Sequence, residues 1–391
     1  MGVGSNPAAG AKEKSKGRET MEYKIAVYTI CKNERQFVDK WVRSMCEADY
    51  ICVLDTGSTD GTYEALLDYA AAFPGKFIIA QKTYSPWRFD AARQDSLALV
   101  PADAAILMCT DLDEELVPGW ADDFRAAWTP ETTRLTYLYA WSHTEDGRPG
   151  RVFWYDKCHS NGEYEWRYPV HETLAFIGER QEKYTYLSGD KIYLHHWPDR
   201  TKSRASYLPL LELRAQEDPS DYYGLVYLAH EYFYQGHYRK CVDFIRTSVL
   251  PRTAEDDAYL CRTDLYLFMG DSYRRLNKRQ MAEEVYLCGI ASDKTYRENY
   301  LALASLYIED KKYDAAIELI HRMFAETWRH YSWLERDSSW TYEPYDLLCQ
   351  AYYYRGTKAV SLDYALLAYM RDQNNARLRA NYELIKNELK E

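Results

Sequence analysis

The stretch KIAVYTICKNE (24–34) is followed by YICVLDTGSTDGT (50–62), and in each a short apolar run gives way to polar residues. Two further apolar runs, KFIIAQ (76–81) and AAILMCT (104–110), come later in the chain. Amphipathic stretches separate these runs, at 34–48 and 62–73 among others. Short strands that alternate with helices in this way predict a parallel α/β sheet.

The chain from about 130 to 197 has a different character, because aromatic and strand-forming residues dominate it. Its apolar runs are RLTYLYAW (134–141), RVFWYDK (151–157) and KIYLHHW (191–197). Runs of this length without intervening helices are typical of β-structure. We therefore expect antiparallel strands here that extend the same sheet domain.

Composition excludes several classes of protein. The chain has 391 residues and a formal net charge of −11, which argues against general duplex DNA binding, since phosphate contacts need a basic face. It has no run of 18 apolar residues, so no membrane span is expected. The nine cysteines are scattered without a C-x-x-C pair, which favours reduced thiols in a cytoplasmic protein. Residues 1–20 lack a signal-peptide core and are predicted to be a disordered tail or a cloning remnant.

After about 205 the sequence is helix-forming and repetitive, and we place an all-α domain at 216–391. A small residue is followed three positions later by Tyr, and nine positions after that by another small residue. The four sets are Ala229 with Tyr232 and Cys241, Gly270 with Tyr273 and Ala282, Ala304 with Tyr307 and Ala316, and Cys349 with Tyr352 and Ser361.

The second and third sets are 34 residues apart, which is the period of the tetratricopeptide repeat, and this part of the chain resembles such repeats. The other intervals are 41 and 45 residues, which predicts insertions or irregular helices between the helix pairs. A generic helical bundle is the alternative.

Polar residues follow three of the predicted strands, and the carboxyl ends of parallel strands are where ligands bind. The three segments are CKNER (31–35), DTGSTDGT (55–62) and TDLDEE (110–115). The sequence contains neither a G-x-G-x-x-G fingerprint nor a Walker loop, so dinucleotide binding and P-loop chemistry are not indicated. Asp111 and Asp113 can both turn toward one cation, and hard oxygen ligands of this kind suit Mn²⁺ or Mg²⁺ held with a substrate diphosphate. A solvated turn or a helix cap is the alternative role of this D-x-D.

Four motifs together resemble the family 2 glycosyltransferases, and their order and spacing match as well: YTICKNE (28–34), VLDTGSTDGT (53–62), FDAARQD (89–95) and MCTDLDEELVPGW (108–120). The resemblance covers roughly 24–205. It implies an α/β, Rossmann-like nucleotide-sugar-binding domain of GT-A fold, placed at 21–205. It also implies a nucleotide-diphospho-sugar donor and inversion at the anomeric carbon.

Two later motifs resemble one branch of that family. They are WRYPVHE (166–172), with the pattern W-x-x-x-V-H-E, and HHWPD (195–199) followed by KSR (202–204). That branch often carries tetratricopeptide repeats behind the transferase domain. Glycocin S-glycosyltransferases and related phage and bacterial enzymes are similar in layout.

The resemblance implies roles in donor binding for four residues. Asp55 would accept a hydrogen bond from the nucleobase, usually uracil N3–H, and Thr29 would line the same pocket. Arg93 resembles the Arg of an Arg-Asn element beside the diphosphate, although Gln94 stands where Asn is usual. Asp111, the first acid of the D-x-D, would contact the ribose side of the donor.

The resemblance also implies the metal ligands. Asp113 would hold Mn²⁺ or Mg²⁺, and a late histidine would complete the metal and diphosphate site. That histidine is His196 or its neighbour His195, and the spacing to Pro198 and Asp199 favours His196. A packing contact at a strand end is the alternative role for this pair.

Inverting transfer requires a carboxylate opposite the leaving group that accepts the proton of the acceptor. Glu172 is our candidate for this base, with Asp156 and Asp60 as weaker candidates. Glu172 could instead orient His171 or a substrate hydroxyl. A thiol acceptor would depend less on a base, because cysteine ionises near neutral pH.

The sequence therefore predicts a metal-dependent glycosyltransferase that uses a nucleotide-diphospho-sugar, UDP-linked by expectation, and modifies a protein or peptide. The repeat domain motivates this acceptor class, since stacked helix pairs suit a peptide or a second subunit. We expect the repeats to capture the acceptor or form a homodimer and to stay apart from the chemistry. A saccharide, lipid-linked glycan or modified nucleobase acceptor is one alternative, and a non-catalytic repeat scaffold is another. The sequence does not specify the sugar.

Overall fold

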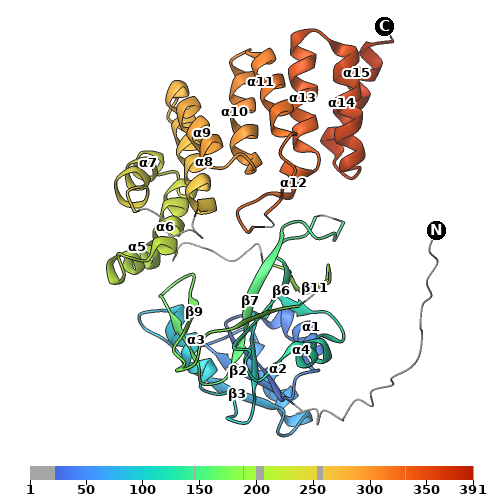
Figure 1. Ribbon diagram of the computed structural model, residues 1–391. Helices are drawn as coiled ribbons and strands as arrows, with labels where there is room; N and C mark the ends of the chain where they lie inside the picture. The colour runs from blue at the N-terminus through green and yellow to red at the C-terminus, as the bar shows by residue number, and fades with distance from the viewer. Residues whose placement is uncertain are drawn as a thin grey trace, which may run out of the picture.

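The computed structural model describes residues 23–144, 146–187, 189–199, 207–252, 259–330 and 332–390. Figure 1 shows a sheet domain built from the N-terminal half and a row of helices built from the C-terminal half. The predicted tail at 1–20, the domain limits at 21 and 205, and the KSR segment at 202–204 lie outside the described residues. No described helix is both long and apolar enough to cross a bilayer.

Among the described residues, nine strands form one sheet in the order β3-β2-β1-β4-β7-β6-β11-β5, with β10 paired to β6. The strands are β1 (Ile25–Cys31), β2 (Tyr50–Asp55), β3 (Phe77–Gln81), β4 (Ile106–Cys109), β5 (Glu114–Leu116), β6 (Arg134–Ala140), β7 (Val152–Ser160), β10 (Tyr184–Tyr186) and β11 (Ile192–His196). A separate pair consists of β8 (Tyr164–Arg167) and β9 (Thr173–Phe176).

The first four strands are parallel, as the strand–helix alternation predicts. All seven residues of β1 are buried, because this strand lies between β2 and β4 and both faces of the sheet are covered. The helices between and after these strands are α1 (Arg35–Met45), α2 (Thr62–Ala72), α3 (Phe89–Leu97) and α4 (Trp120–Ala127). The carboxyl ends of β1, β2 and β4 therefore meet at one edge.

The predicted antiparallel extension is confirmed. β7 pairs antiparallel with both β4 and β6, and β5 pairs antiparallel with β11. β11 itself runs parallel to β6. The register of β5 and β11 places His196 opposite Glu114, so the late histidines lie beside the segment that follows β4.

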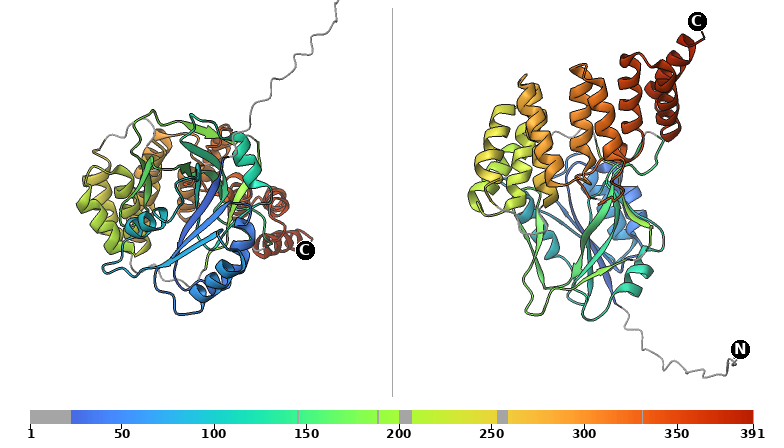
Figure 2. Two further views of the ribbon diagram at one scale, coloured as in Figure 1. Left: turned by 90° about the horizontal axis from the view of Figure 1, so that it is seen from below. Right: turned by 45° about the horizontal axis from the view of Figure 1, so that its top comes forward.

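The C-terminal half forms a series of antiparallel helix pairs (Figure 2). Its helices are α5 (Tyr207–Glu217), α6 (Tyr222–Tyr234), α7 (Tyr238–Phe244), the π-helix η1 (Ile245–Val249), α8 (Tyr259–Arg275), α9 (Arg279–Ser292), α10 (Arg297–Glu309), α11 (Tyr313–Met323), α12 (Asp337–Trp340), α13 (Glu343–Arg355), α14 (Lys358–Arg371) and α15 (Ala376–Glu388). Helix α5 spans the position 216 at which the sequence places the start of this domain.

The small residues of the repeat pattern lie where the two helices of a pair meet. A Cβ atom on Gly270 of α8 would come within 2.2 Å of the Tyr286 ring of α9. Ser361 of α14 donates a hydrogen bond to the Cys349 carbonyl of α13, at 2.8 Å. The pattern therefore marks tight helix–helix contacts, as in tetratricopeptide repeats.

The predicted insertion between the last two sets is the segment 324–342, which includes α12. It packs on the array itself. Trp333 lies 5.4 Å from the Tyr227 ring of α6, and the Arg336 amide donates to Glu298 of α10 at 2.8 Å. The faces of α6 and α10 that it contacts are thus partly covered by the chain's own segment.

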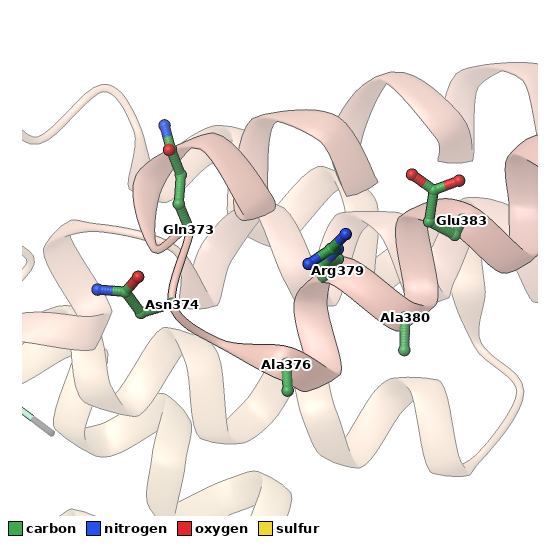
Figure 3. A pocket seen from close by; sticks show the side chains of 6 residues that line it. All are labelled: Gln373, Asn374, Ala376, Arg379, Ala380 and Glu383. Carbon is green, nitrogen blue, oxygen red and sulfur yellow. The ribbon is translucent and has the colours of Figure 1, made fainter. Parts of the chain in front are cut away.

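The two halves also touch at the far end of the array. Asn374, between α14 and α15, donates to Asp146 of the β6–β7 hairpin at 2.5 Å, and Arg148 lies 3.6 Å from Asp372. Figure 1 shows this hairpin reaching from the sheet domain toward the array. A surface hollow beside this contact (Figure 3) is lined by Gln373, Asn374, Ala376, Arg379, Ala380 and Glu383. It contains none of the candidate site residues.

His159 of β7 is a fully buried titratable group in the sheet domain. Its Nδ1 lies 2.9 Å from the Ser160 carbonyl and its Nε2 lies 2.8 Å from the Tyr28 hydroxyl. A carbonyl only accepts, so Nδ1 carries the proton and Nε2 accepts from Tyr28. Burial lowers the pKa of His159 to about 3, which keeps the ring neutral.

His159→Gln is therefore expected to gain stability relative to wild type as the pH falls. The folded-state pKa lies below the ordinary 6.5, so the stability that neutral His159 contributes is present above pH 6.5 and is lost as the pH falls toward 3. Between pH 7.5 and pH 4.5 the difference in free energy of unfolding should shift by about 3 kcal/mol in favour of the variant. Urea denaturation at both pH values measures the shift, and a constant difference would contradict a buried neutral ring.

Candidate active site

The D-x-D lies in the turn between β4 and β5, at the carboxyl end of the parallel strands. The Asp111 side chain is 40% exposed, and its backbone amide donates to Glu114 at 2.9 Å. Asp113 is held by its backbone, since its carbonyl accepts from the Trp197 amide at 2.7 Å. The first acid therefore faces solvent at the sheet edge, and the second is tied to the chain after β11.

Arg93 joins two of the predicted acids. Its Nη2 donates to Asp111 at 2.5 Å and its Nε donates to Glu172 at 2.8 Å. The Arg93 side chain is only 4% exposed, and that of Glu172 is 9% exposed. Burial would lower the pKa of Arg93, but the charges of Asp111, Cys109 and Glu172 raise it well above its ordinary value. Three residues from distant parts of the sequence thus form one charged cluster.

Lys157 is a second cation beside this cluster, and no sequence motif identified it. Lys157 of β7 has its ammonium 5.7 Å from the Trp166 ring, while the Arg93 guanidinium lies 5.5 Å from the same ring. Burial would lower the pKa of Lys157, but Tyr155, Asp111 and Glu172 outweigh this effect and raise it. The alternation of β7 could have suggested that Lys157 faces inward, but nothing in the sequence pairs it with Arg93.

The neighbour of Arg93, Gln94, has a different partner. Its side-chain oxygen accepts from the Trp166 amide at 2.9 Å, so helix α3 holds strand β8 as well as the acids.

Asp113 and His196 meet, as the resemblance implies. His196 Nε2 lies 3.4 Å from Asp113, and its Nδ1 lies 2.9 Å from the Trp141 carbonyl. The carbonyl requires a proton on Nδ1, which leaves Nε2 with its lone pair toward Asp113 in the neutral ring. Burial would lower the pKa of His196, but in the absence of a bound cation Asp113 raises it to about 9.

His195 belongs to a different cluster. Its Nδ1 lies 2.9 Å from His143 Nε2, and the two rings stack with centroids 5.1 Å apart. Burial lowers the pKa of His195. Successive residues of a strand face opposite sides, which places His196 beside Asp113 and turns His195 away from it.

In the described part of the chain, no group of three or more His, Cys, Asp or Glu side chains is placed to hold a metal ion. Asp113 and His196 offer one oxygen and one nitrogen ligand. A carboxylate with an imidazole fits Mn²⁺, whose remaining ligands can come from a substrate diphosphate and water. The residues present fit a cation that is bound together with its donor.

The two residues assigned to the base pocket are fully buried. Asp55 Oδ1 accepts from the amides of Gly57 and Ser58, at 2.9 Å each, and from Gln81 at 2.8 Å. Burial raises the pKa of Asp55, but hydrogen bonds from the Ser58 side chain and amide, from Gln81 and from Gly57 outweigh it and lower the pKa below its ordinary value. The Thr29 hydroxyl donates to the Ile30 carbonyl. In this conformation neither side chain is exposed to solvent.

The two weaker candidates for the base lie elsewhere. Asp60 accepts from the Thr62 amide at 3.0 Å and from the Arg35 amide at 3.1 Å, so it ties the first turns of α1 and α2 together. Asp156 pairs with Arg134 at 2.9 Å. Of the three carboxylates considered, Glu172 is the one that contacts Arg93.

Glu114 is a further acid that the sequence did not single out. It is buried, and Tyr139 donates to its Oε1 at 2.7 Å. Burial and the charge of Asp111 raise the pKa of Glu114 to about 7. The pairing of β5 with β11 brings Glu114 opposite His196.

The sequence that carries this site is similar to known proteins. Residues 26–147 match the family model described as "Glycosyl transferase family 2". The lipopolysaccharide core biosynthesis glycosyltransferase LpsC of Rhizobium meliloti (strain 1021) is 28% identical over 161 residues. That alignment covers 39% of this chain and 57% of LpsC, so the chain spans little more than half the length of this curated relative.

Solved structures are similar to the helical half. A MamA crystal structure is 16% identical, covering 46% of this chain and 99% of MamA with a TM-score of 0.35. A thermophilic TPR protein of Thermus thermophilus is 18% identical, covering 46% of this chain and 89% of that protein with a TM-score of 0.34. Residues 26–147 thus belong to a family 2 glycosyltransferase domain of α/β fold, and the helix pairs that follow carry the small–Tyr–small spacing of tetratricopeptide repeats.

Proposed function

We propose that this protein is a metal-dependent, inverting glycosyltransferase that transfers a sugar from a UDP-linked donor to a protein or peptide. The observation that carries the proposal is the Arg93 bridge between Asp111 and Glu172. Arg93 and Asp111 lie within the segment that matches the family 2 model, and Glu172 joins them from the loop between β8 and β9.

The charges of the cluster suit departure of a diphosphate. Arg93 and Lys157 balance Asp111 and Glu172 in the protein alone, and a diphosphate would add negative charge beside them. A divalent cation held by Asp113 and His196 would stabilise that charge as a Lewis acid. Arg93 and Lys157 would stabilise the negative charge that develops on the leaving oxygens as the glycosidic bond breaks.

The oxygen or sulfur of the acceptor would attack the anomeric carbon, and Glu172 would take the proton that this atom loses. The Arg93 contact fixes one oxygen of this carboxylate, Oε1, at 2.8 Å. A base must be held within hydrogen-bond reach of the proton that it removes, and this contact holds the Glu172 carboxylate in one orientation. The position of Glu172 next to the donor acids supports the base role over Asp60 and Asp156.

The repeat domain supports a peptide acceptor. Tyr223 and Tyr234 of α6 and Trp328 of the 324–342 insertion are exposed aromatic side chains, which would supply contact area for a peptide. A homodimer through the repeats is part of the same proposal, and exposed apolar side chains on the last two helices support it, namely Leu366, Met370 and Leu384. LpsC, named for lipopolysaccharide core biosynthesis, favours a saccharide or lipid-linked glycan acceptor as the second candidate.

Thermal denaturation tests the donor class. At about 100 times its Kd, UDP with Mn²⁺ should raise the Tm by about 5–10 °C, because it binds only the folded state. GDP with Mn²⁺ should raise it less, since Asp55 is proposed to accept from uracil N3–H. A larger shift with GDP would contradict the UDP assignment. Release of UDP from UDP-sugars without an acceptor would separate an enzyme from a non-catalytic scaffold.

A further inference from the structure

The loop that carries Glu172 has an unusual backbone. Tyr168 and His171 adopt positive φ angles, of 79° and 48°, without being glycine. Such conformations cost of order 1–3 kcal/mol each and persist only where surrounding contacts impose them. The Phe89 amide of α3 donates to the Pro169 carbonyl of this loop at 3.0 Å, and further contacts come from the helical repeats.

Arg214 of α5 makes the central contact. It is 1% exposed, and its Nη1 donates to the carbonyls of Val170 at 3.0 Å and His171 at 2.6 Å. Its Nε donates to Asp221 at 2.5 Å, and its guanidinium lies 3.9 Å from the centre of the Tyr168 ring. One buried side chain of the helical domain therefore binds three parts of the loop that precedes Glu172.

The first helix pair is shaped to hold this arginine. A Cβ atom on Gly224 of α6 would lie 2.2 Å from the Asp221 carboxylate and 2.5 Å from Arg214 Nε. Residue 224 therefore leaves the space that the Arg214–Asp221 pair occupies. A larger residue there would displace the pair.

A ring stack holds the same loop from α6. The His171 and Tyr227 rings are nearly parallel, at 6°, with centroids 4.1 Å apart. Trp333 of the insertion packs on Tyr227, with centroids 5.4 Å apart. The residue directly before Glu172 is thus fixed by α6 and the insertion together.

Helix α5 also reaches the other half of the charged cluster. Glu217 accepts from Arg88, which directly precedes α3, at 2.5 and 3.0 Å. Helix α3 carries Arg93. The two partners of the Arg93–Glu172 ion pair therefore both stand on segments that α5 holds.

We propose that Arg214 is a positioning residue for the transfer reaction, and that the first helices of the repeat domain set the place of Glu172 against Arg93. This inference rests on the proposed function. It also differs from the expectation that the repeats stay apart from the chemistry. The helical domain is then part of the active-site architecture, whatever acceptor it binds.

Arg214→Lys in the full chain tests the proposal. Lysine keeps the charge, but its single ammonium cannot serve Asp221 and both carbonyls with the fork of a guanidinium. We expect faster hydrogen–deuterium exchange at 168–173. We also expect a fall in kcat of about 10²-fold with donor KM within about twofold, because the base is misplaced while the donor site stays intact.

Arg279→Lys is the matched control. Arg279 of α9 also donates to a carboxylate and a carbonyl, those of Asp310 at 2.5 Å and Leu306 at 3.2 Å, and it contacts the end of α10 instead of the loop. This control variant should lower the Tm without changing hydrogen–deuterium exchange at 168–173 or kcat. Equal effects of the two variants on kcat would overturn the proposal, because they would reflect general stability.

Tyr227→Leu and Tyr227→Phe form a second test, at a ring that stacks on His171 and lies 5.9 Å from the Arg214 guanidinium. Leu removes the stack on His171 and should lower kcat, whereas Phe keeps the ring and should restore it. Unchanged exchange and kcat in both Arg214→Lys and Tyr227→Leu would overturn the positioning role. A wild-type protein that turns over no nucleotide-sugar would instead overturn the proposed function, while the exchange measurement still reads how the loop is held.

Discussion

Glu172→Gln is expected to lower kcat for a hydroxyl acceptor by about 10²–10⁴-fold, the usual contribution of general-base catalysis. The amide oxygen of Gln can still accept the hydrogen bond that Arg93 donates to Oε1. The shape of the site and its donor affinity should therefore persist, while the group that takes the proton is lost. Steady-state kinetics with donor and acceptor varied separately measures the effect.

The matched control is Asp156→Asn. Asp156 is a carboxylate of the same domain that is ion-paired to an arginine, Arg134, but lies outside the Arg93 cluster. The Asp156→Asn variant should keep kcat within about threefold of the wild-type value, since Asp156 is not proposed to take a proton. Unchanged turnover in Glu172→Gln on the true acceptor would remove Glu172 from the mechanism.

The same variant distinguishes acceptor atoms. A thiol acceptor ionises by itself as the pH approaches its pKa near 8.5, so its dependence on a base falls. The loss caused by Glu172→Gln should therefore shrink with rising pH for a thiol and persist for a hydroxyl. A pH series of kcat for both enzymes measures this difference.

The second large effect concerns the cation. EDTA should abolish transfer and Mn²⁺ should restore it best, because several kcal/mol of charge stabilisation depend on the ion, or about 10³-fold in rate. Asp113→Ala should bind the donor poorly and be inactive. Full activity of the wild type or of Asp113→Ala in EDTA would contradict metal dependence.

The neighbouring histidines supply a matched pair for this test. His196 Nε2 faces Asp113, whereas His195 pairs with His143. His196→Ala should raise the Mn²⁺ concentration needed for half-maximal activity, and His195→Ala should leave it unchanged within about twofold. Equal effects of the two substitutions would show that the histidine pair acts through packing.

Local sequence determines much of this protein. Hydrophobic runs with helix-forming stretches between them specify the parallel strands, because a buried strand and an amphipathic helix are encoded within a few residues. The repeat pattern likewise marks the helix contacts at Gly270 and Ser361, since only a small side chain fits there. The acids after β2 and β4 could be placed at the ligand-binding edge for the same reason.

Only the tertiary structure decides which of these residues meet. Strand register turns His196 toward Asp113 and His195 away, and it brings Lys157 to the charged cluster from a strand that no motif connects to Arg93. The burial of Thr29 and Asp55 depends equally on neighbours far away in the chain. The contact of Arg214 with the loop before Glu172 joins two domains across 43 and 44 residues. Such contacts form only when separately encoded elements pack together, so local patterns of charge and hydrophobicity carry no signal for them.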